Sequence, residues 1–248
     1  MIYNDSWVDN NGINIHFVEA NANIKEKAPL VIIPGLSESA EDYISVIENF
    51  SPRHCIIITL RGRGKSATPE TGYTLEDHIS DIDAVVKQLE LKDFILFGYS
   101  RSVSYALGYA IRNNNLLKGL IVGDYPAVHT QLRQGWVEFF SSLPPWRGKT
   151  LSQRMNLTAL YGIQNESSQV LLWDDLSSIK CPALIIRGGK NEAALSLEAG
   201  NLYIEKMHQA NLVVFDDSDH NIFEPNLDTF IKTVDEFMKN IDMKIFQR

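Results

Sequence analysis

The stretch DFILFGYSRSVSYALGYAIR, residues 93–112, decides the fold of this 248-residue chain. Its first half is a continuous apolar run, which is typical of a strand buried on both faces of a parallel sheet. Its second half is rich in small residues and has the apolar periodicity of a helix. Ser100 stands between the two. A strand, a tight turn and a helix in this order predict a nucleophile elbow, which lifts a serine hydroxyl above the sheet edge.

The Gly-x-Ser pattern alone is weak evidence, because it also occurs at Gly35-x-Ser37 and Gly64-x-Ser66. Only Ser100 lies directly between an apolar strand and an apolar-periodic helix. The plainer alternative is a strand-to-helix turn in which a serine caps the helix. We favour the nucleophile, because the helix N-terminus offers free backbone N–H groups and a dipole that stabilise an anionic intermediate.

Apolar runs of the same kind recur along the chain, at residues 30–34, 55–60, 120–124, 183–187 and 212–216. Segments with helical periodicity fill the gaps between them. One follows Thr74, and its apolar stripe consists of Leu75, Ile79, Ile82, Val86 and Leu89. Strands that alternate with helices predict βαβ units and a mostly parallel sheet with helices on both faces.

The two ends of the chain show further local signals. Asn11-Gly12 stands in the middle of the alternating segment 6–20, and this dipeptide favours a tight β-hairpin turn because it adopts positive φ readily. Near the C-terminus, Ile222, Phe230, Val234 and Phe237 form a second helical stripe. We therefore expect an initial hairpin and a final helix.

About 55 residues between Asp124 and Ile179 carry no clear strand, and connections this long inside a compact domain are usually lids or binding inserts. The chain is thus predicted to consist of a core, residues 1–124 and 179–248, and a small helical cap, residues 125–178. The cap is rich in aromatic residues. Most of these are expected to form its own core, and the candidates for substrate contact are Trp136, Phe140 and Trp146.

A serine hydroxyl is a weak nucleophile at neutral pH, so a base must lie beside it. Among six histidines, His220 follows the apolar run 212–216 in the polar loop DDSDHN. Parallel strands share one carboxyl edge, so this loop is expected to open on the same side as Ser100. His129, in the cap, is the only rival and would act as a substrate contact.

These residues together resemble the α/β-hydrolase fold family of serine hydrolases, and the likeness covers nearly the whole chain. It rests on Pro34-Gly35-Leu36, Arg61–Ser66, the elbow, Cys181-Pro182 and Asp219-His220. The resemblance implies an eight-stranded, mostly parallel sheet. It also implies Ser100 as nucleophile and His220 as base, with an acid between them in chain order.

In this family the acid usually follows the strand before the histidine strand. Here that turn reads Arg187-Gly188-Gly189-Lys190-Asn191-Glu192. Glu192 is preferred, because an amide at Asn191 cannot stabilise an imidazolium as a carboxylate does. Asp124, which ends the preceding strand, is the alternative.

An oxyanion requires two fixed N–H donors. By the resemblance these are the backbone amides of Leu36 and Arg101. Two positions depart from the family pattern: Pro34 stands in the oxyanion loop where histidine is usual, and the elbow ends in Ser102 where glycine is commoner. Proline lacks an N–H and fixes φ, so the loop is expected to differ in shape.

Composition excludes several other classes. The net charge is −8, from 23 basic and 31 acidic residues, and no basic run occurs, so nucleic acid and anionic membranes are poor partners. No run approaches the about 18 apolar residues of a membrane helix, and the polar N-terminus is no signal peptide. The two cysteines, Cys55 and Cys181, read as buried thiols. We expect a cytoplasmic protein that uses neither metal nor cofactor.

The sequence therefore predicts a serine hydrolase that cleaves a small or medium, largely apolar carboxylic ester or lactone through an acyl-enzyme. Two alternatives stay open. One is hydrolysis of a carbon–carbon bond with the same three residues. The other is a ligand receptor or regulatory protein on this fold with slow or no turnover. Oligomeric state is not predicted.

Overall fold

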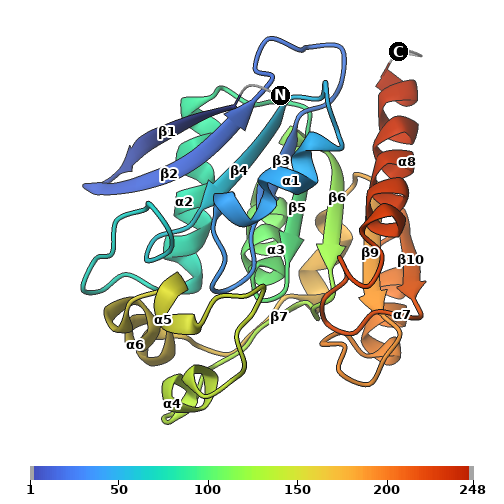
Figure 1. The fold of residues 1–248 in the computed structure, drawn as a ribbon. Helices are drawn as coiled ribbons and strands as arrows, with labels where there is room; N and C mark the ends of the chain where they lie inside the picture. The colour runs from blue at the N-terminus through green and yellow to red at the C-terminus, as the bar shows by residue number, and fades with distance from the viewer. Residues whose placement is uncertain (1–2, 246–248) are drawn as a thin grey trace.

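The computed structural model describes residues 3–245, so the outermost residues of the predicted core segments, 1–2 and 246–248, lie outside the described part. Eight strands form one sheet in the order β1-β2-β4-β3-β5-β6-β9-β10. β1 and β2 are antiparallel to their neighbours, and the remaining pairs are parallel. This is the predicted α/β architecture (Figure 1).

The strands β3, β4, β5, β6, β9 and β10 overlap the apolar runs of the sequence, and β1 and β2 form the predicted hairpin. Their bounds are β1 Tyr3–Asn10, β2 Ile13–Ala20, β3 Leu30–Ile33, β4 Cys55–Thr59, β5 Phe94–Tyr99, β6 Leu117–Gly123, β9 Ala183–Gly188 and β10 Ala210–Phe215. β3, β4 and β5 are buried at every position, as expected for strands covered on both faces. The β1–β2 turn is made by Asn11 and Gly12, with φ of 54° and 85°, as the hairpin signal predicts.

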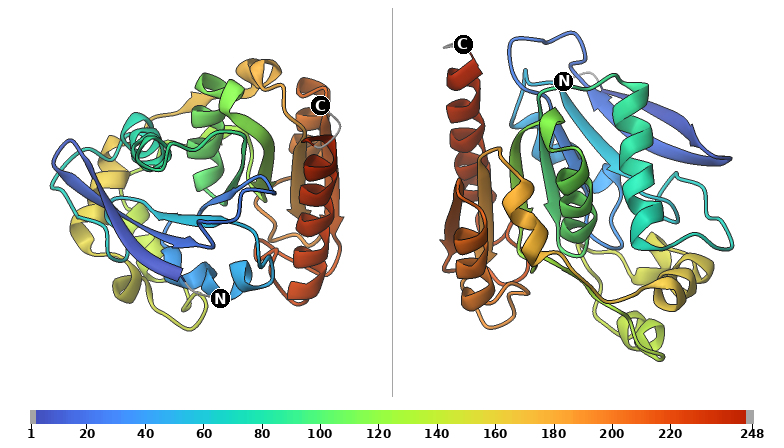
Figure 2. Two further views of the ribbon diagram at one scale, coloured as in Figure 1. Left: turned by 90° about the horizontal axis from the view of Figure 1, so that it is seen from above. Right: turned by 180° about the vertical axis from the view of Figure 1, so that it is seen from behind.

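Helices cover both faces of the sheet. On one face lie α2 (Leu75–Gln88), α3 (Ser102–Arg112) and α7 (Leu197–Lys206), and on the other lie α1 (Ile44–Glu48) and α8 (Leu227–Ile245). The left view of Figure 2 shows these two layers. The fold also contains three short 3-10 helices within the described residues, η1 (Ala40–Tyr43), η2 (Asn114–Leu116) and η3 (Trp173–Ser178). Each apolar side chain fully buried between these layers contributes about 1.5–3 kcal/mol.

Local capping sets the helix ends. Thr74 Oγ1 accepts from the amide of Asp77, and Asp77 returns a bond to the Thr74 amide, so α2 begins where the capping signal indicated. The last helix begins later than its apolar stripe suggested. Asn226 accepts from the amides of Asp228 and Thr229, and Ile222 is a buried residue of the preceding loop.

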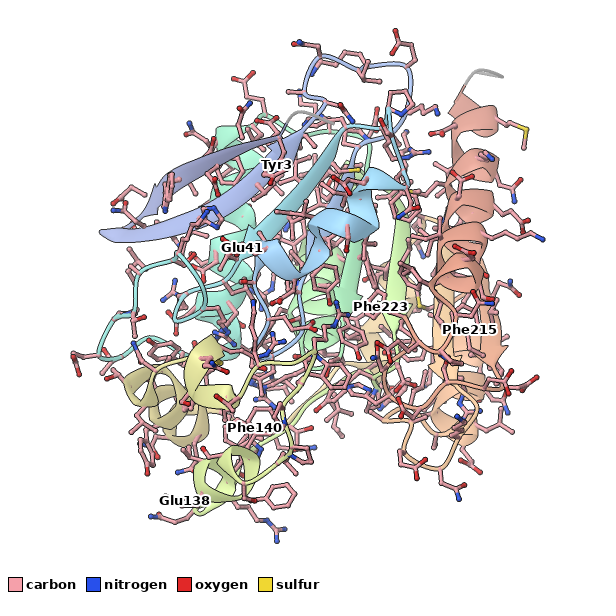
Figure 3. The ribbon with its side chains drawn as sticks, viewed as in Figure 1. Tyr3, Glu41, Glu138, Phe140, Phe215 and Phe223 are labelled. Atoms are coloured by element: carbon pink, nitrogen blue, oxygen red, sulfur yellow. The ribbon has the colours of Figure 1, made fainter. Side chains whose placement is uncertain are left out.

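The cap contains β7 (Val128–His129), α4 (Trp136–Ser141), α5 (Leu151–Arg154), α6 (Leu157–Glu166) and β8 (Val170–Leu171). β7 and β8 pair in a separate two-stranded sheet. Figure 1 shows the three helices gathered beyond the end to which the arrows of β6 and β9 point. Figure 3 shows side chains filling the space there, with Glu138 and Phe140 of α4 labelled. The cap thus stands over the carboxyl edge of the sheet.

Candidate active site

Ser100 sits in a strained turn between β5 and α3. Its φ is 55°, in the left-handed region that non-glycine residues rarely adopt and that costs about 1–3 kcal/mol. The turn is held by the Ser100 amide, which donates to Gly123 O over 2.8 Å, and by the Val103 amide, which donates to Ser100 O. A Cβ at Gly98 would lie 2.9 Å from the Ser102 carbonyl oxygen, so glycine is required for the helix to pass this close.

A hydrogen-bonded chain links Ser100 to two distant residues. Ser100 Oγ lies 2.8 Å from His220 Nε2, and His220 Nδ1 lies 2.7 Å from Asp124 Oδ2. A carboxylate only accepts, so Nδ1 carries the proton and the Nε2 lone pair faces the serine hydroxyl. The arrangement can take the hydroxyl proton as the oxygen attacks a carbonyl carbon.

Asp124 is fixed by the backbone around it. The residue is fully buried, directly follows β6 and has a φ of 47°. Its carboxylate accepts from the amides of Gly188 and Ala194, at 3.1 and 2.8 Å. These bonds orient the carboxylate toward His220.

The preference for Glu192 as the acid is corrected by this geometry. Glu192 lies on the turn after β9, is exposed, and lines the rim of the pocket without bonding to the imidazole. The physical reason is that the turn after β9 contributes backbone amides, those of Gly188 and Ala194, which donate to the Asp124 carboxylate. The turn therefore orients the acid and does not supply it. Asp124, the alternative acid, directly follows the strand beside the nucleophile strand and is the carboxylate that meets His220.

Tyr99 supports the imidazole and was not singled out in the sequence. Its hydroxyl donates to the backbone oxygen of His220 over 2.7 Å, and its ring stacks on the imidazole with centroids 5.3 Å apart. Burial raises the pKa of Tyr99 well above its ordinary value, so it remains a donor. The only available signal was its place directly before Ser100.

The two candidate oxyanion donors lie at the edge of one pocket. Leu36 and Arg101 both line it, and within residues 3–245 neither backbone amide donates to a protein acceptor. The hydroxyl of Ser102 donates to Pro34 O over 2.5 Å. The two departures from the family pattern are therefore in contact with each other: the serine that replaces glycine ties the elbow to the loop that begins with proline.

The Arg101 side chain turns away into the protein. Its guanidinium is buried and lies 3.2 Å from His129 Nε2, whose Nδ1 lies 3.0 Å from Ser104 Oγ. Burial, reinforced by the charge of Arg101, lowers the pKa of His129 to about 3. His129 is thus a neutral buried acceptor, and it does not line the pocket as a substrate contact.

The pocket over Ser100 has a volume of about 670 Å³. All three candidate contact residues line it. The rings of Trp136 and Phe140 stack on each other at 4.8 Å, and the Trp146 ring lies 6.5 Å from that of His220. Most of the remaining lining from the cap is apolar, namely Leu132, Leu143, Pro144, Pro145 and Leu151.

One group of side chains in the described part could hold a metal ion by proximity: Asp5, His16 and Glu41. The Lys65 ammonium lies 2.6 Å from Asp5 Oδ1 and 3.2 Å from Glu41 Oε1. A lysine cation therefore already neutralises these carboxylates. No helix within residues 3–245 combines the length and apolar character that crossing a membrane takes.

The fold and the Asp–His–Ser chain at its carboxyl edge define a hydrolase of the α/β class. A sequence model of the alpha/beta hydrolase fold matches residues 28–152, and the chain belongs to this family. Hydrolysis is the activity that the family supports.

Among its relatives, the (E)-2-((N-methylformamido)methylene)succinate hydrolase of Acinetobacter baylyi is 26% identical over 213 residues, which are 75% of this chain and 79% of the relative. The solved esterase of Exiguobacterium antarcticum superposes with a TM-score of 0.76 at 23% identity, covering 94% of this chain and 99% of the other. An E-2-(acetamidomethylene)succinate hydrolase superposes with a TM-score of 0.74 at 20% identity, covering 96% and 100%. The two solved structures show the shared fold.

Proposed function

We propose that the protein hydrolyses small or medium, largely apolar carboxylic esters or lactones through an acyl-enzyme on Ser100. The observation that carries the proposal is the 2.8 Å separation of Ser100 Oγ and His220 Nε2 at the floor of the pocket. The imidazole lies within reach of the hydroxyl proton, and the buried Asp124 stabilises the imidazolium that forms.

The reaction has two halves. In the first, Ser100 Oγ attacks the ester carbonyl, His220 takes the hydroxyl proton, and the amides of Leu36 and Arg101 stabilise the oxyanion. The ester C–O bond then breaks, and His220 gives its proton to the departing alkoxide. In the second, His220 takes a proton from water, whose oxygen attacks the acyl carbon, and Ser100 recovers its proton as the acid leaves.

A neutral substrate is favoured by the charges in the pocket. Two of the relatives are named for succinate derivatives. In this chain, however, two of the three cations that line the pocket are already paired with a carboxylate. Lys149 and Arg154 both pair with Asp42, at 3.4 and 3.0 Å, and the buried Arg101 faces His129. A carboxylate on the substrate would compete with Asp42, whereas an apolar acyl group meets the aromatic lining directly.

The test is hydrolysis of p-nitrophenyl butyrate by the purified protein and by Ser100→Ala. We expect turnover by the wild type and a loss of at least about 10³-fold in the variant, as for removal of a nucleophile that acts with a base. A fluorophosphonate should label the wild type on Ser100 and leave Ser100→Ala unlabelled. Labelling without turnover across a panel of esters and lactones would refute the enzyme and favour a ligand receptor.

A further inference from the structure

Hydrogen bonds to two backbone oxygens hold the loop that carries the Leu36 amide. Gly35 O accepts from the Glu38 amide over 3.0 Å, and Leu36 O accepts from Arg63 Nε over 2.8 Å. Gly35 O and Leu36 N belong to one trans peptide, whose C=O and N–H point in opposite directions. Holding the carbonyl on Glu38 therefore fixes where the Leu36 N–H points.

Glu38 holds this loop a second time, through its side chain. The carboxylate is buried, and its Oε2 accepts from the Gly35 amide at 2.9 Å and from the Tyr43 hydroxyl at 2.6 Å. A Cβ at Gly35 would lie 2.7 Å from Oε2, so the fit leaves no room for a side chain there. Glu38 thus holds both the peptide that contains the Leu36 N–H and the peptide before it.

The other carboxylate oxygen of Glu38 contacts residues of the cap. Glu38 Oε1 accepts from Trp146 Nε1 at 2.7 Å and lies 3.1 Å from Arg147 Nε. These donors sit on a tight turn, Trp146–Lys149, in which Trp146 and Lys149 exchange two backbone bonds. The Arg147 guanidinium also stacks 4.6 Å from the Phe223 ring. Burial disfavours the Arg147 charge, but the nearby Glu38 carboxylate outweighs burial and raises the pKa of Arg147.

A buried carboxylate that loses its donors is costly, because desolvation is no longer compensated. Undocking the turn Trp146–Lys149 removes a hydrogen bond and a cation from Glu38 at once. The carboxylate would then move toward water and release Gly35. The position of the cap and the direction of the Leu36 N–H are therefore linked through the Glu38 side chain.

We propose that Glu38 is a positioning residue that couples docking of the cap turn Trp146–Lys149 to the orientation of the Leu36 amide. The inference rests on the proposed function, because it assigns the Leu36 amide to the oxyanion. It predicts that loss of Glu38 or of its cap donors impairs the transition state rather than substrate binding.

The test uses Glu38→Gln, Trp146→Phe and the double variant, with p-nitrophenyl butyrate. Glu38→Gln should lower kcat about 10- to 100-fold, below the 10²–10³-fold of a deleted oxyanion donor, with KM within about threefold. Trp146→Phe keeps the ring and removes the donor, so kcat should fall by less. The double variant should be no slower than Glu38→Gln, because Trp146 acts through Glu38. Glu48→Gln and Trp173→Phe are matched controls away from the site.

Wild-type kcat in Glu38→Gln, a loss confined to KM, or multiplicative losses in the double variant would each overturn the proposal. If Glu38→Gln does not fold, Trp146→Phe alone decides by the same split of kcat from KM. If the wild type hydrolyses no ester, the proposed function is refuted, but the role of Glu38 can still be tested. The rate of Ser100 phosphonylation then tests Glu38, with slowing expected in Glu38→Gln and an unchanged rate refuting the coupling.

Discussion

The Nδ1 atom of His220 lies 2.7 Å from the carboxylate of Asp124, 96 residues earlier in the chain. Asp124 directly follows β6, and the loop of His220 follows β10 at the sheet edge. Between them, β9 supplies the amide of Gly188 to the same carboxylate. The acid, the base and the backbone that orients the acid thus come from neighbouring strands, and this relationship sets most of the expected mutational behaviour.

Replacement of the acid should identify it directly. Asp124→Asn keeps the shape of the side chain but presents an amide to His220 Nδ1, which favours the wrong tautomer. We expect kcat on p-nitrophenyl butyrate to fall about 10³- to 10⁴-fold. Glu192→Gln, at an exposed carboxylate on the rim of the pocket, should stay within about twofold of the wild type. The reverse order of effects would restore Glu192 as the acid.

A methyl group at Gly188 should disturb the acid and the base together. An added Cβ would lie 2.0 Å from the Asp219 carbonyl oxygen, so the loop that carries His220 must shift. We expect Gly188→Ala to lose at least about 2 kcal/mol in urea unfolding, as for strained core substitutions, and most of its kcat. The control is Gly200→Ala in α7, where an added Cβ meets only side-chain atoms, Leu212 Cδ2 at 3.1 Å and Arg187 Cδ at 3.8 Å, and we expect activity to be retained. A fully active, stable Gly188→Ala would contradict the packing.

Removal of the Ser102 hydroxyl should weaken the contact between the elbow and the oxyanion loop. Ser102→Ala leaves the Pro34 carbonyl without its buried donor, at a cost of about 1–3 kcal/mol in stability. Since this carbonyl belongs to the loop that carries Leu36, kcat should also fall severalfold. Urea melts and steady-state kinetics check both effects, with the exposed Ser45→Ala as control. Unchanged stability and kcat would show that the bond is dispensable.

Acid should destabilise the protein through His129. Its folded-state pKa of about 3 lies below the ordinary value of 6.5, so below pH 6.5 the unfolded chain binds a proton that the folded chain refuses. The stability that neutral His129 contributes is therefore fully present above pH 6.5. It is lost as the pH falls toward 3, by up to about 1.4 kcal/mol per pH unit. Buried His78, whose pKa is lowered well below its ordinary value by burial and by Arg63, acts in the same direction.

His129→Gln should remove its part of this acid sensitivity, because glutamine accepts from Arg101 without titrating. Urea unfolding between pH 7 and 4.5 should show a shallower decline than in the wild type. His208→Gln, on the surface, is the control and should keep the wild-type slope. A slope that does not differ between His129→Gln and the wild type would rule out this contribution.

Local patterns were sufficient for most of the fold. Alternation around Asn11-Gly12 set the first hairpin, continuous apolar runs marked the parallel strands, and Thr74 marked the start of α2. These signals are strong because backbone conformation and burial act on neighbouring residues. The start of α8 was placed too early by apolar spacing, because Ile222 is buried in a loop, and burial alone does not distinguish loop from helix.

The sequence by itself determined the fold class and pointed to Ser100 and His220, because an elbow and a polar loop after a buried strand are local features of the chain. Only the tertiary structure decided which carboxylate meets the imidazole, that Tyr99 supports it, and that Glu38 joins the cap to the loop of Leu36. The physical reason is that a hydrogen bond needs its two atoms within about 3 Å, and such closeness between residues about 100 apart is set by the packing of strands and cap.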